Sequence, residues 1–214
     1  MNRRRLLRTL SVAALLPLVG RLAFGERASA ATQAGNVDVD AILNDPDAPV
    51  VGNPEGDVTI VAFIDYNCPF CKKSDPDLRR LVARDGRIKL IYKDWPILAE
   101  TSVYGARLAL AANYQEKYEA AHAALFALHG KRSSELSMRS AVEAAGVDMA
   151  RLDADLNAHG EAIGDLLERN AAQADALGLK GAPVFLIGPY LVEAALNYQG
   201  FSEAVSKFRS QIAK

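Results

Sequence analysis

The two cysteines of this chain stand three positions apart in "DYNCPFCKK", directly after the apolar run "VTIVAFIDY". A near-continuous apolar run rich in β-branched residues predicts a strand over 58–66 that is buried on both faces. The following "CKKSDPDLRRLVARDG" predicts a helix that ends near Gly86, and "RIKLIYKDWP" predicts a second strand that Pro96 ends. This order predicts a strand–helix–strand crossover unit with Cys68 and Cys71 at the carboxyl end of its first strand.

The middle of the chain carries a helical pattern and no strand pattern. One apolar stripe at spacings of three and four predicts a helix face made of Tyr114, Tyr118, Ala121, Leu125 and Leu128. Further helices are predicted around 135–145, 149–158 and 161–177, separated by Gly146 and Gly160. Strand patterns return in "APVFLIG" and "YLVEA", and the chain closes with an amphipathic helix over 201–212.

The amino terminus reads as a targeting segment. The chain has 25 basic and 26 acidic residues, and its first 30 residues hold six of the arginines and one glutamate, which leaves 19 basic and 25 acidic side chains in the body. A basic start, a short apolar run and the small residues "ASA" predict an exported protein whose signal peptide is cleaved between Ala30 and Ala31. "NRRRLLR" also fits a twin-arginine signal, so the export route stays open. The mildly acidic body lacks the clustered Lys and Arg that nucleic acid requires, so we expect no nucleic-acid partner.

These patterns divide the chain into five parts. We expect a signal peptide (1–30), an N-terminal extension (31–57), a first half with the cysteine pair (58–98), a helical insertion (99–178) and a second half (179–214).

Three uses of the cysteine pair compete. A structural zinc site needs about four ligands, whereas the chain offers two cysteines and the scattered His122, His129 and His159. We therefore expect no metal. A purely structural disulfide between Cys68 and Cys71 would close a loop of only two residues and would restrain little of the unfolded chain. Thiol–disulfide chemistry is the remaining use.

The position of the pair explains how it would react. Unpaired backbone N–H groups and the helix dipole stabilise an anion at a helix N-terminus, so Cys68 should ionise more easily than a free thiol. Lys72 and Lys73 could add to this effect from the first turn of the helix. Cys71, one turn in, should be more buried and protonated.

The ordered motifs "CPFCKKSDP", "KDWPILAETSVYGARLALAA" and "GAPVF" resemble the DsbA family of exported thioredoxin-fold proteins, in particular those grouped with ScsC and BdbD. The resemblance covers roughly residues 42–212. It implies an α/β thioredoxin fold with a large helical insertion. It also implies a protein thiol–disulfide oxidoreductase that needs no cofactor beyond its own cysteines.

The resemblance also implies roles for individual residues. Cys68 would be the attacking nucleophile and Cys71 the resolving cysteine, while Pro183 would be a cis-proline that faces them. Ala182 would pair through its backbone with an extended substrate, which is β-strand addition. The candidate substrate-binding residues are Ala182, Pro69 and Phe70. An apolar surface around the site is predicted from Phe63, Tyr66, Phe70, Trp95 and Phe185, although Phe63 and Trp95 are better read as core.

The chain departs from the family pattern at Ala62, where many relatives have a buried glutamate six residues before the first cysteine, and at Ala182, where threonine or valine is common. Phe70 also stands where some strong oxidants have histidine. Loss of that potential hydrogen-bond donor predicts a less stabilised thiolate and a less oxidising protein. Asp65 lies nearer the thiols, and its side chain could either serve them or face solvent at the strand end.

The direction of exchange stays open at the level of sequence. As an oxidase, the protein would pass its disulfide to cysteine-containing exported clients and be regenerated by a membrane redox partner. As a reductase or isomerase it would have to be kept in the dithiol form. A chaperone or copper-binding protein that uses the same thiols is a further alternative, since two soft thiolates suit Cu(I). The segment before the first strand lacks a long heptad pattern, so we expect a monomer.

Overall fold

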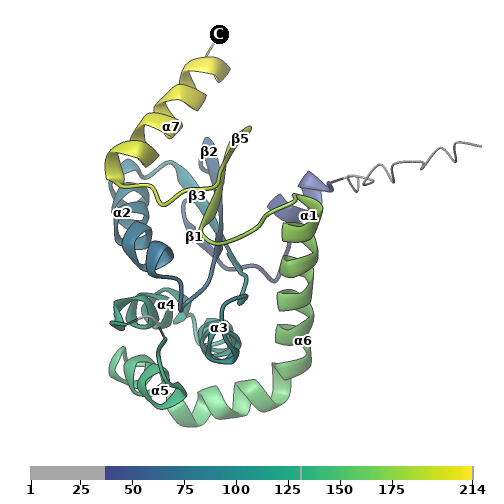
Figure 1. The fold of residues 1–214 in the computed structure, drawn as a ribbon, viewed down its shortest axis with the longest axis vertical. Coiled ribbons are helices and arrows are strands. Elements are labelled where there is room, and N and C mark those ends of the chain that lie inside the picture. Colours follow the sequence, from purple (N-terminus) through teal and green to yellow (C-terminus); the bar gives the residue numbers. More distant parts are fainter. Residues whose placement is uncertain (1–36, 131, 214) are drawn as a thin grey trace, which may run out of the picture. The chain divides into compact units, whose positions relative to one another are not determined.

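The structure, a computed structural model, describes residues 37–130 and 132–213. The predicted signal peptide and the first residues of the predicted N-terminal extension lie outside these ranges. The described residues form one five-stranded sheet and seven helices (Figure 1). None of the helices in these two ranges has both the length and the apolar character needed to cross a membrane.

The sheet has the strand order β1-β3-β2-β4-β5. Its members are β1 (Val50–Gly52), β2 (Val58–Ile64), β3 (Ile88–Asp94), β4 (Val184–Ile187) and β5 (Tyr190–Val192). Strands β2 and β3 are parallel, in a register that runs from Val58 opposite Ile88 to Ile64 opposite Asp94. The other neighbouring pairs are antiparallel. The parallel pair requires the crossover helix that the sequence predicts between 58–66 and 87–96.

Strand β1 lies in the segment that the sequence analysis described only as an N-terminal extension (31–57), without a strand. Val50 pairs with Ile91, and the three residues of β1 add an antiparallel edge to the sheet. The strand is short and lies between Pro49 and Pro54 in a polar segment, so it carries no periodic pattern of its own. Its partner on β3 determines that it forms.

Helices cover both faces of the sheet (Figure 1). Helices α2 (Pro69–Asp85) and α7 (Tyr198–Ile212) pack on one face, and α1 (Val39–Leu43) and the carboxyl-terminal part of α6 (Met149–Ala176) pack on the other. Side chains of β2 alternate between the two faces, with Ile60, Ala62 and Ile64 on the α2 side and Val61 and Phe63 on the α1 side. Because all of these side chains are buried, β2 reads as the continuous apolar run seen in the sequence.

The helical block between β3 and β4 holds α3 (Glu100–Asn113), α4 (Tyr118–Ala127), α5 (Glu135–Ala144) and α6. The predicted stripe from Tyr114 to Leu128 is wrong as a single helix, because Tyr114 caps the end of α3 and the chain turns before α4 begins. A positive φ of 59° at Glu116 marks that turn.

Helix α6 also differs from the prediction of two helices separated by Gly160. It runs without a break over 28 residues. Gly160 lies against α3, where its carbonyl accepts a hydrogen bond from Arg107 Nη1 (3.3 Å), and a Cβ there would come within 3.0 Å of the same guanidinium. Gly160 therefore lies at a contact between α3 and α6 and does not break the helix.

Candidate active site

Cys68 is the N-cap of α2, the helix that follows the buried strand β2. Its backbone is extended (φ −76°, ψ 116°), and its Sγ accepts a hydrogen bond from the backbone N–H of Cys71 at 3.3 Å. Pro69 occupies the first helical position, where its missing N–H costs nothing and its fixed φ suits the helix. The sequence therefore places a sulfur at the N-cap, the position where backbone N–H groups are free to bind an anion.

The two cysteines are not joined by a disulfide in the structure, and their thiol pKa values are shifted in opposite directions. The hydrogen bond from the Cys71 thiol, together with the backbone N–H groups of Cys71 and Phe70, lowers the pKa of Cys68 to about 7 against the opposing effects of burial and the Asp65 charge. Burial, and then the neighbouring Cys68, raises the pKa of Cys71 well above its usual value. At neutral pH one sulfur is partly a thiolate and the other keeps its proton.

The segment before β4 faces the Cys68 sulfur. The Ala182–Pro183 peptide bond is cis, as the family resemblance implied. The Cys68 thiol donates to the carbonyl oxygen of Ala182, with an Sγ···O distance of 3.1 Å. A cleft of about 320 Å³ adjoins this contact, lined by Phe70, Gly181, Ala182, Pro183, Glu193, Ala194 and Ala195. The residues predicted for the site thus lie together although they are more than 100 positions apart.

The predicted apolar surface is smaller than the sequence suggested. Phe70 is 61% exposed beside the cysteines, whereas Tyr66 and Phe185 are buried in the core. Phe63 and Trp95 are buried as well, in line with their reading as core, and their rings pack edge to face. Of the five aromatic side chains, Phe70 is therefore the one that lies open at the surface beside the cysteines.

Asp65 does not face solvent, so that alternative is wrong. Its carboxylate is buried and accepts four hydrogen bonds. The donors are the backbone N–H groups of Asn67 (2.7 Å), Ile97 (2.8 Å) and Leu98 (2.9 Å) and the hydroxyl of Ser102 (2.8 Å). These contacts fix the turn before Cys68 against the segment that follows β3. Its negative charge at the same time opposes ionisation of both cysteines.

Asn67 is a residue of the site that the sequence analysis did not single out. Its amide donates to Thr101 Oγ1 (2.9 Å) and Ser102 Oγ (3.0 Å), and its Oδ1 accepts from the backbone N–H of Ser133 (2.8 Å). Lys72 makes a second link, because its Nζ donates to the carbonyl oxygen of Leu128 at 2.7 Å. The cysteine turn is thereby tied to the helical block on two sides.

His122, which the sequence analysis named only as one of three scattered histidines, lies in the core. It is fully buried in α4, with Nε2 2.8 Å from Asp75 Oδ1 and Nδ1 2.9 Å from the Tyr66 hydroxyl. Tyr92 donates to the same Asp75 oxygen (3.0 Å), and Arg79 donates to the other (2.8 Å). Burial opposes ionisation of Asp75, but His122 and Arg79 hold its pKa below the usual range. We call Tyr66, Asp75, Tyr92 and His122 the histidine cluster.

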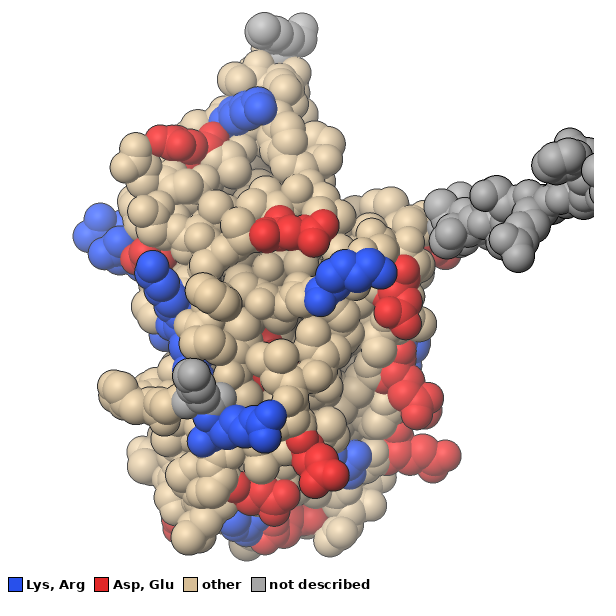
Figure 2. All heavy atoms as spheres, in the orientation of Figure 1, with Lys and Arg blue, Asp and Glu red and all other residues tan. Residues whose placement is uncertain are grey.

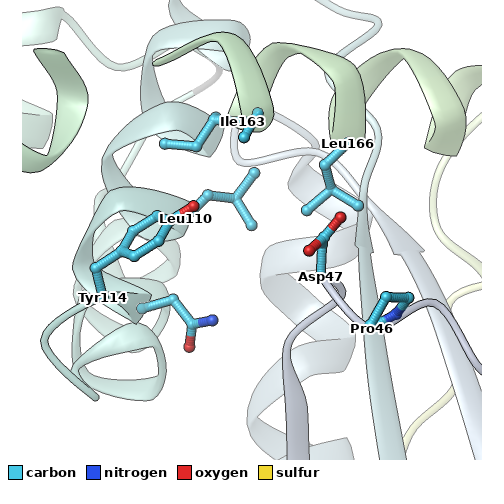
Figure 3. Close-up of a pocket in the computed structure, with 8 residues that line it drawn as sticks. Pro46, Asp47, Leu110, Tyr114, Ile163 and Leu166 are labelled. Carbon is cyan, nitrogen blue, oxygen red and sulfur yellow. The ribbon is translucent and has the colours of Figure 1, made fainter. Parts of the chain in front are cut away.

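The structure also contains a cavity away from the cysteines. Figure 3 shows it between α3, α6 and the segment that leads into β1, with a volume of about 190 Å³. None of its lining residues belongs to the cysteine turn, and the carboxylate of its lining residue Asp47 is held by Arg169 at 2.6 Å. Within the described residues, no group of three or more His, Cys, Asp or Glu side chains is placed to hold a metal ion.

Comparison with known proteins agrees with this geometry. The thioredoxin family model matches residues 44–207. The chain belongs to the thioredoxin family. A thioredoxin-like oxidoreductase from Silicibacter pomeroyi is 39% identical, with a TM-score of 0.74 over 80% of this chain and 97% of that one. The thiol–disulfide exchange protein alpha-DsbA2 from Wolbachia pipientis is 29% identical, with a TM-score of 0.73 over 79% and 91%.

The predicted branch of the family is confirmed as well. The catalytic domain of Proteus mirabilis ScsC is 26% identical, with a TM-score of 0.71 over 82% of this chain and 94% of that one. A curated relative, a Na⁺/H⁺ antiporter from Salinispora tropica, is 28% identical over 83% of this chain, which spans only 28% of that protein's length. This member of the thioredoxin family thus has the DsbA-like fold, the thioredoxin fold with a helical insertion that the resemblance implied.

Proposed function

We propose that this thioredoxin-family member is an exported thiol–disulfide oxidoreductase that exchanges its Cys68–Cys71 disulfide with the thiols of client proteins and supports disulfide formation. The observation that carries the proposal is the pair of unlike thiols. Cys68 is an N-cap sulfur with a pKa of about 7, and it sits three residues before a buried Cys71 whose pKa is raised. A reactive thiolate beside a protonated partner is what two-step thiol–disulfide exchange requires.

In the oxidising direction, a client thiolate attacks Cys68 Sγ of the disulfide form. The Cys68–Cys71 bond breaks, and Cys71 leaves as a thiolate that takes up a proton, since its buried site favours the thiol. A second client thiolate then attacks the client sulfur of the mixed disulfide and releases Cys68. The client loses two electrons and two thiol protons, and the two electrons remain in the Cys68–Cys71 dithiol.

The client is held by the residues around the nucleophile. An extended client segment pairs with the backbone of Ala182 beside Pro183, and its side chains contact the exposed Pro69 and Phe70. The carbonyl of Ala182 lies 3.1 Å from Cys68 Sγ, so a segment paired there brings a client sulfur to the reacting atom. Proximity of this kind is the main contribution that the fold can make to the rate.

Export and regeneration complete the proposal. The basic start, the apolar run and the "ASA" site of the first 30 residues support export with cleavage after Ala30. Exported clients keep their disulfides only where the environment is oxidising. The dithiol left after each turnover must be reoxidised, for which we propose a membrane redox partner that accepts two electrons. We further propose that the protein works as a monomer.

The reduction potential of the Cys68–Cys71 couple tests the proposal. A pKa of about 7 resembles thioredoxin more than DsbA, so we expect a potential between roughly −270 mV and roughly −120 mV in glutathione buffers. The Cys71→Ser variant, which cannot form the internal disulfide, is the control and should show no such couple. A potential at or below that of thioredoxin would assign the protein to the reductases, and absence of a reversible two-electron couple would refute the proposed function.

A further inference from the structure

Glu193 is the one charged residue that lines the cleft beside the nucleophile. The other lining side chains are Phe70, Pro183 and alanines, with Gly181 completing the wall. Glu193 directly follows β5, the edge strand of the sheet, and its side chain is exposed. The lining of the cleft is therefore apolar except for one carboxylate, that of Glu193.

The carboxylate of Glu193 is unused within the described part of the chain. Within the described residues, 37–130 and 132–213, this carboxylate makes no hydrogen bond and no ion pair. A second cavity adjoins the cleft and is lined by Asp77. The Asp77 carboxylate, by contrast, already forms an ion pair with Arg80 (2.8 Å) and accepts a hydrogen bond from the backbone N–H of Tyr198 (3.0 Å). Glu193 thus offers a free negative charge to whatever enters the cleft.

The charges around the cysteines differ from one side to the other. The cleft with Glu193 meets the second cavity at Ala195, which lines both, and the exposed Lys73 and the partly buried Asp77 also line that second cavity. A separate cavity of about 420 Å³ contains both Arg132 and Glu100. Figure 2 shows one face of the protein, where acidic and basic side chains are interspersed around a broad uncharged area. Glu193 is the one charged residue in the lining next to Ala182 and Pro183, and the exposed Lys180 directly precedes the lining residue Gly181.

We propose that Glu193 is a specificity-determining residue that favours clients with a lysine or arginine two positions from the reacting cysteine. This inference rests on the proposed function and adds a substrate preference to it. Lysine and arginine carry an apolar stem and a charged head, so the stem fits against Phe70 and the alanines while the head reaches the carboxylate. Side chains two apart on an extended segment point the same way, so residues −2 and +2 face the protein together with the client cysteine.

The test uses dithiol peptides with Lys, Gln or Glu at −2 or +2 of the reacting cysteine, oxidised by the disulfide form of the purified protein. We expect the Lys peptide to react about two- to fivefold faster than the Glu peptide at one or both positions, the size of an exposed ion pair. The same exchange at −1 and +1, which point away, should matter less. The preference should shrink at about 1 M salt, where the Debye length falls to about 3 Å.

Variants assign the preference to Glu193. In Glu193→Gln the Lys-to-Glu rate ratio should fall towards one, and in Glu193→Lys it should invert; a ratio measured within one variant is insensitive to any general loss of activity. The matched control is Glu168→Gln, which removes an exposed carboxylate of α6 and should keep the wild-type ratio.

Three results would overturn the inference. Equal rates for the Lys and Glu peptides in the wild type would show that the protein does not discriminate between client charges. A Lys preference that survives in Glu193→Gln would show that another residue is responsible for it. If the protein oxidised none of the peptides, the Gln peptides included, the proposed function would fail and the preference with it.

Discussion

Two buried sets of polar groups lie along the first turns of α2, the cysteine pair and the histidine cluster around Asp75, and they differ in how their polar atoms are bonded. At the N-terminus, Cys68 Sγ interacts with the Cys71 thiol, the backbone N–H groups of Cys71 and Phe70 and the Ala182 carbonyl, and the Phe70 side chain beside it is open to solvent. One turn beyond Cys71, Asp75 receives donors on both oxygens from Tyr92, Arg79 and the imidazole of His122. The two regions share a helix and a core.

The difference teaches that burial alone does not make a group reactive. Both regions remove titratable atoms from water, which costs free energy unless partners compensate. In the histidine cluster the partners come from α2, α4, β3 and the end of β2, so the cluster holds those elements together. At the cysteine turn the partners of the sulfur are nearby thiol and backbone groups, and the cleft lined by Phe70 and Ala182 adjoins it, so the sulfur can change its bonds.

The largest effect that separates the two regions should come from His122→Phe. The substitution keeps a ring in the core but removes one buried partner of the Tyr66 hydroxyl and one of Asp75, so we expect a loss of about 2–4 kcal/mol in the free energy of unfolding. The pKa of Cys68 should stay near 7, because Cys71, nearby backbone N–H groups and Asp65 set it. Urea denaturation and the pH dependence of alkylation measure the two quantities.

The control for that variant is His159→Phe. This ring stacks on Tyr114 at 3.9 Å and lies half-buried on α6, so an aromatic replacement should cost less than about 0.5 kcal/mol. If His122→Phe left stability unchanged, or moved the pKa of Cys68 by about one unit, the two regions would not be independent as described.

A smaller effect, about tenfold, should appear in the pH dependence of Cys68. A thiol is nucleophilic as its thiolate, and with a pKa of about 7 the thiolate fraction rises about tenfold between pH 6 and pH 8 and then levels off. Alkylation of the reduced protein by iodoacetamide should follow this curve, while Cys71, buried and with a raised pKa, should not react. A rate that kept rising to pH 10 would instead indicate an ordinary thiol.

The sequence predicts the reactive region better than the supporting one. The buried run of β2, the cysteine spacing and the cap at Gly86 are local patterns, so α2 and its flanking strands appear where they were expected. His122 lies four residues after Tyr118, on the apolar face that the sequence predicts for this helix, but no local pattern pairs it with Asp75, which is 47 positions away.

The other errors have the same physical origin. Strand β1 forms because β3 offers it an edge, and α6 continues through Gly160 because α3 packs against it. In each case a tertiary contact overrides a local preference for a turn or a break. The buried network of Asp65 was missed for this reason too, since its donors come from the segment after β3 and from α3.

The smallest effect concerns the link between the two regions and the helical block. The sequence analysis placed Lys72 as a possible support for the Cys68 thiolate, yet its Nζ donates to the carbonyl of Leu128. The charge still interacts favourably with Cys68, so Lys72→Gln should raise the pKa of Cys68 by a few tenths of a unit and slow alkylation at pH 6.5 by less than about twofold. Lys73→Gln, which removes the exposed neighbouring charge, is the matched control and should change less. A fall of fivefold or more in Lys72→Gln would mean that the ammonium, rather than the Cys71 thiol and the helix N–H groups, stabilises the thiolate.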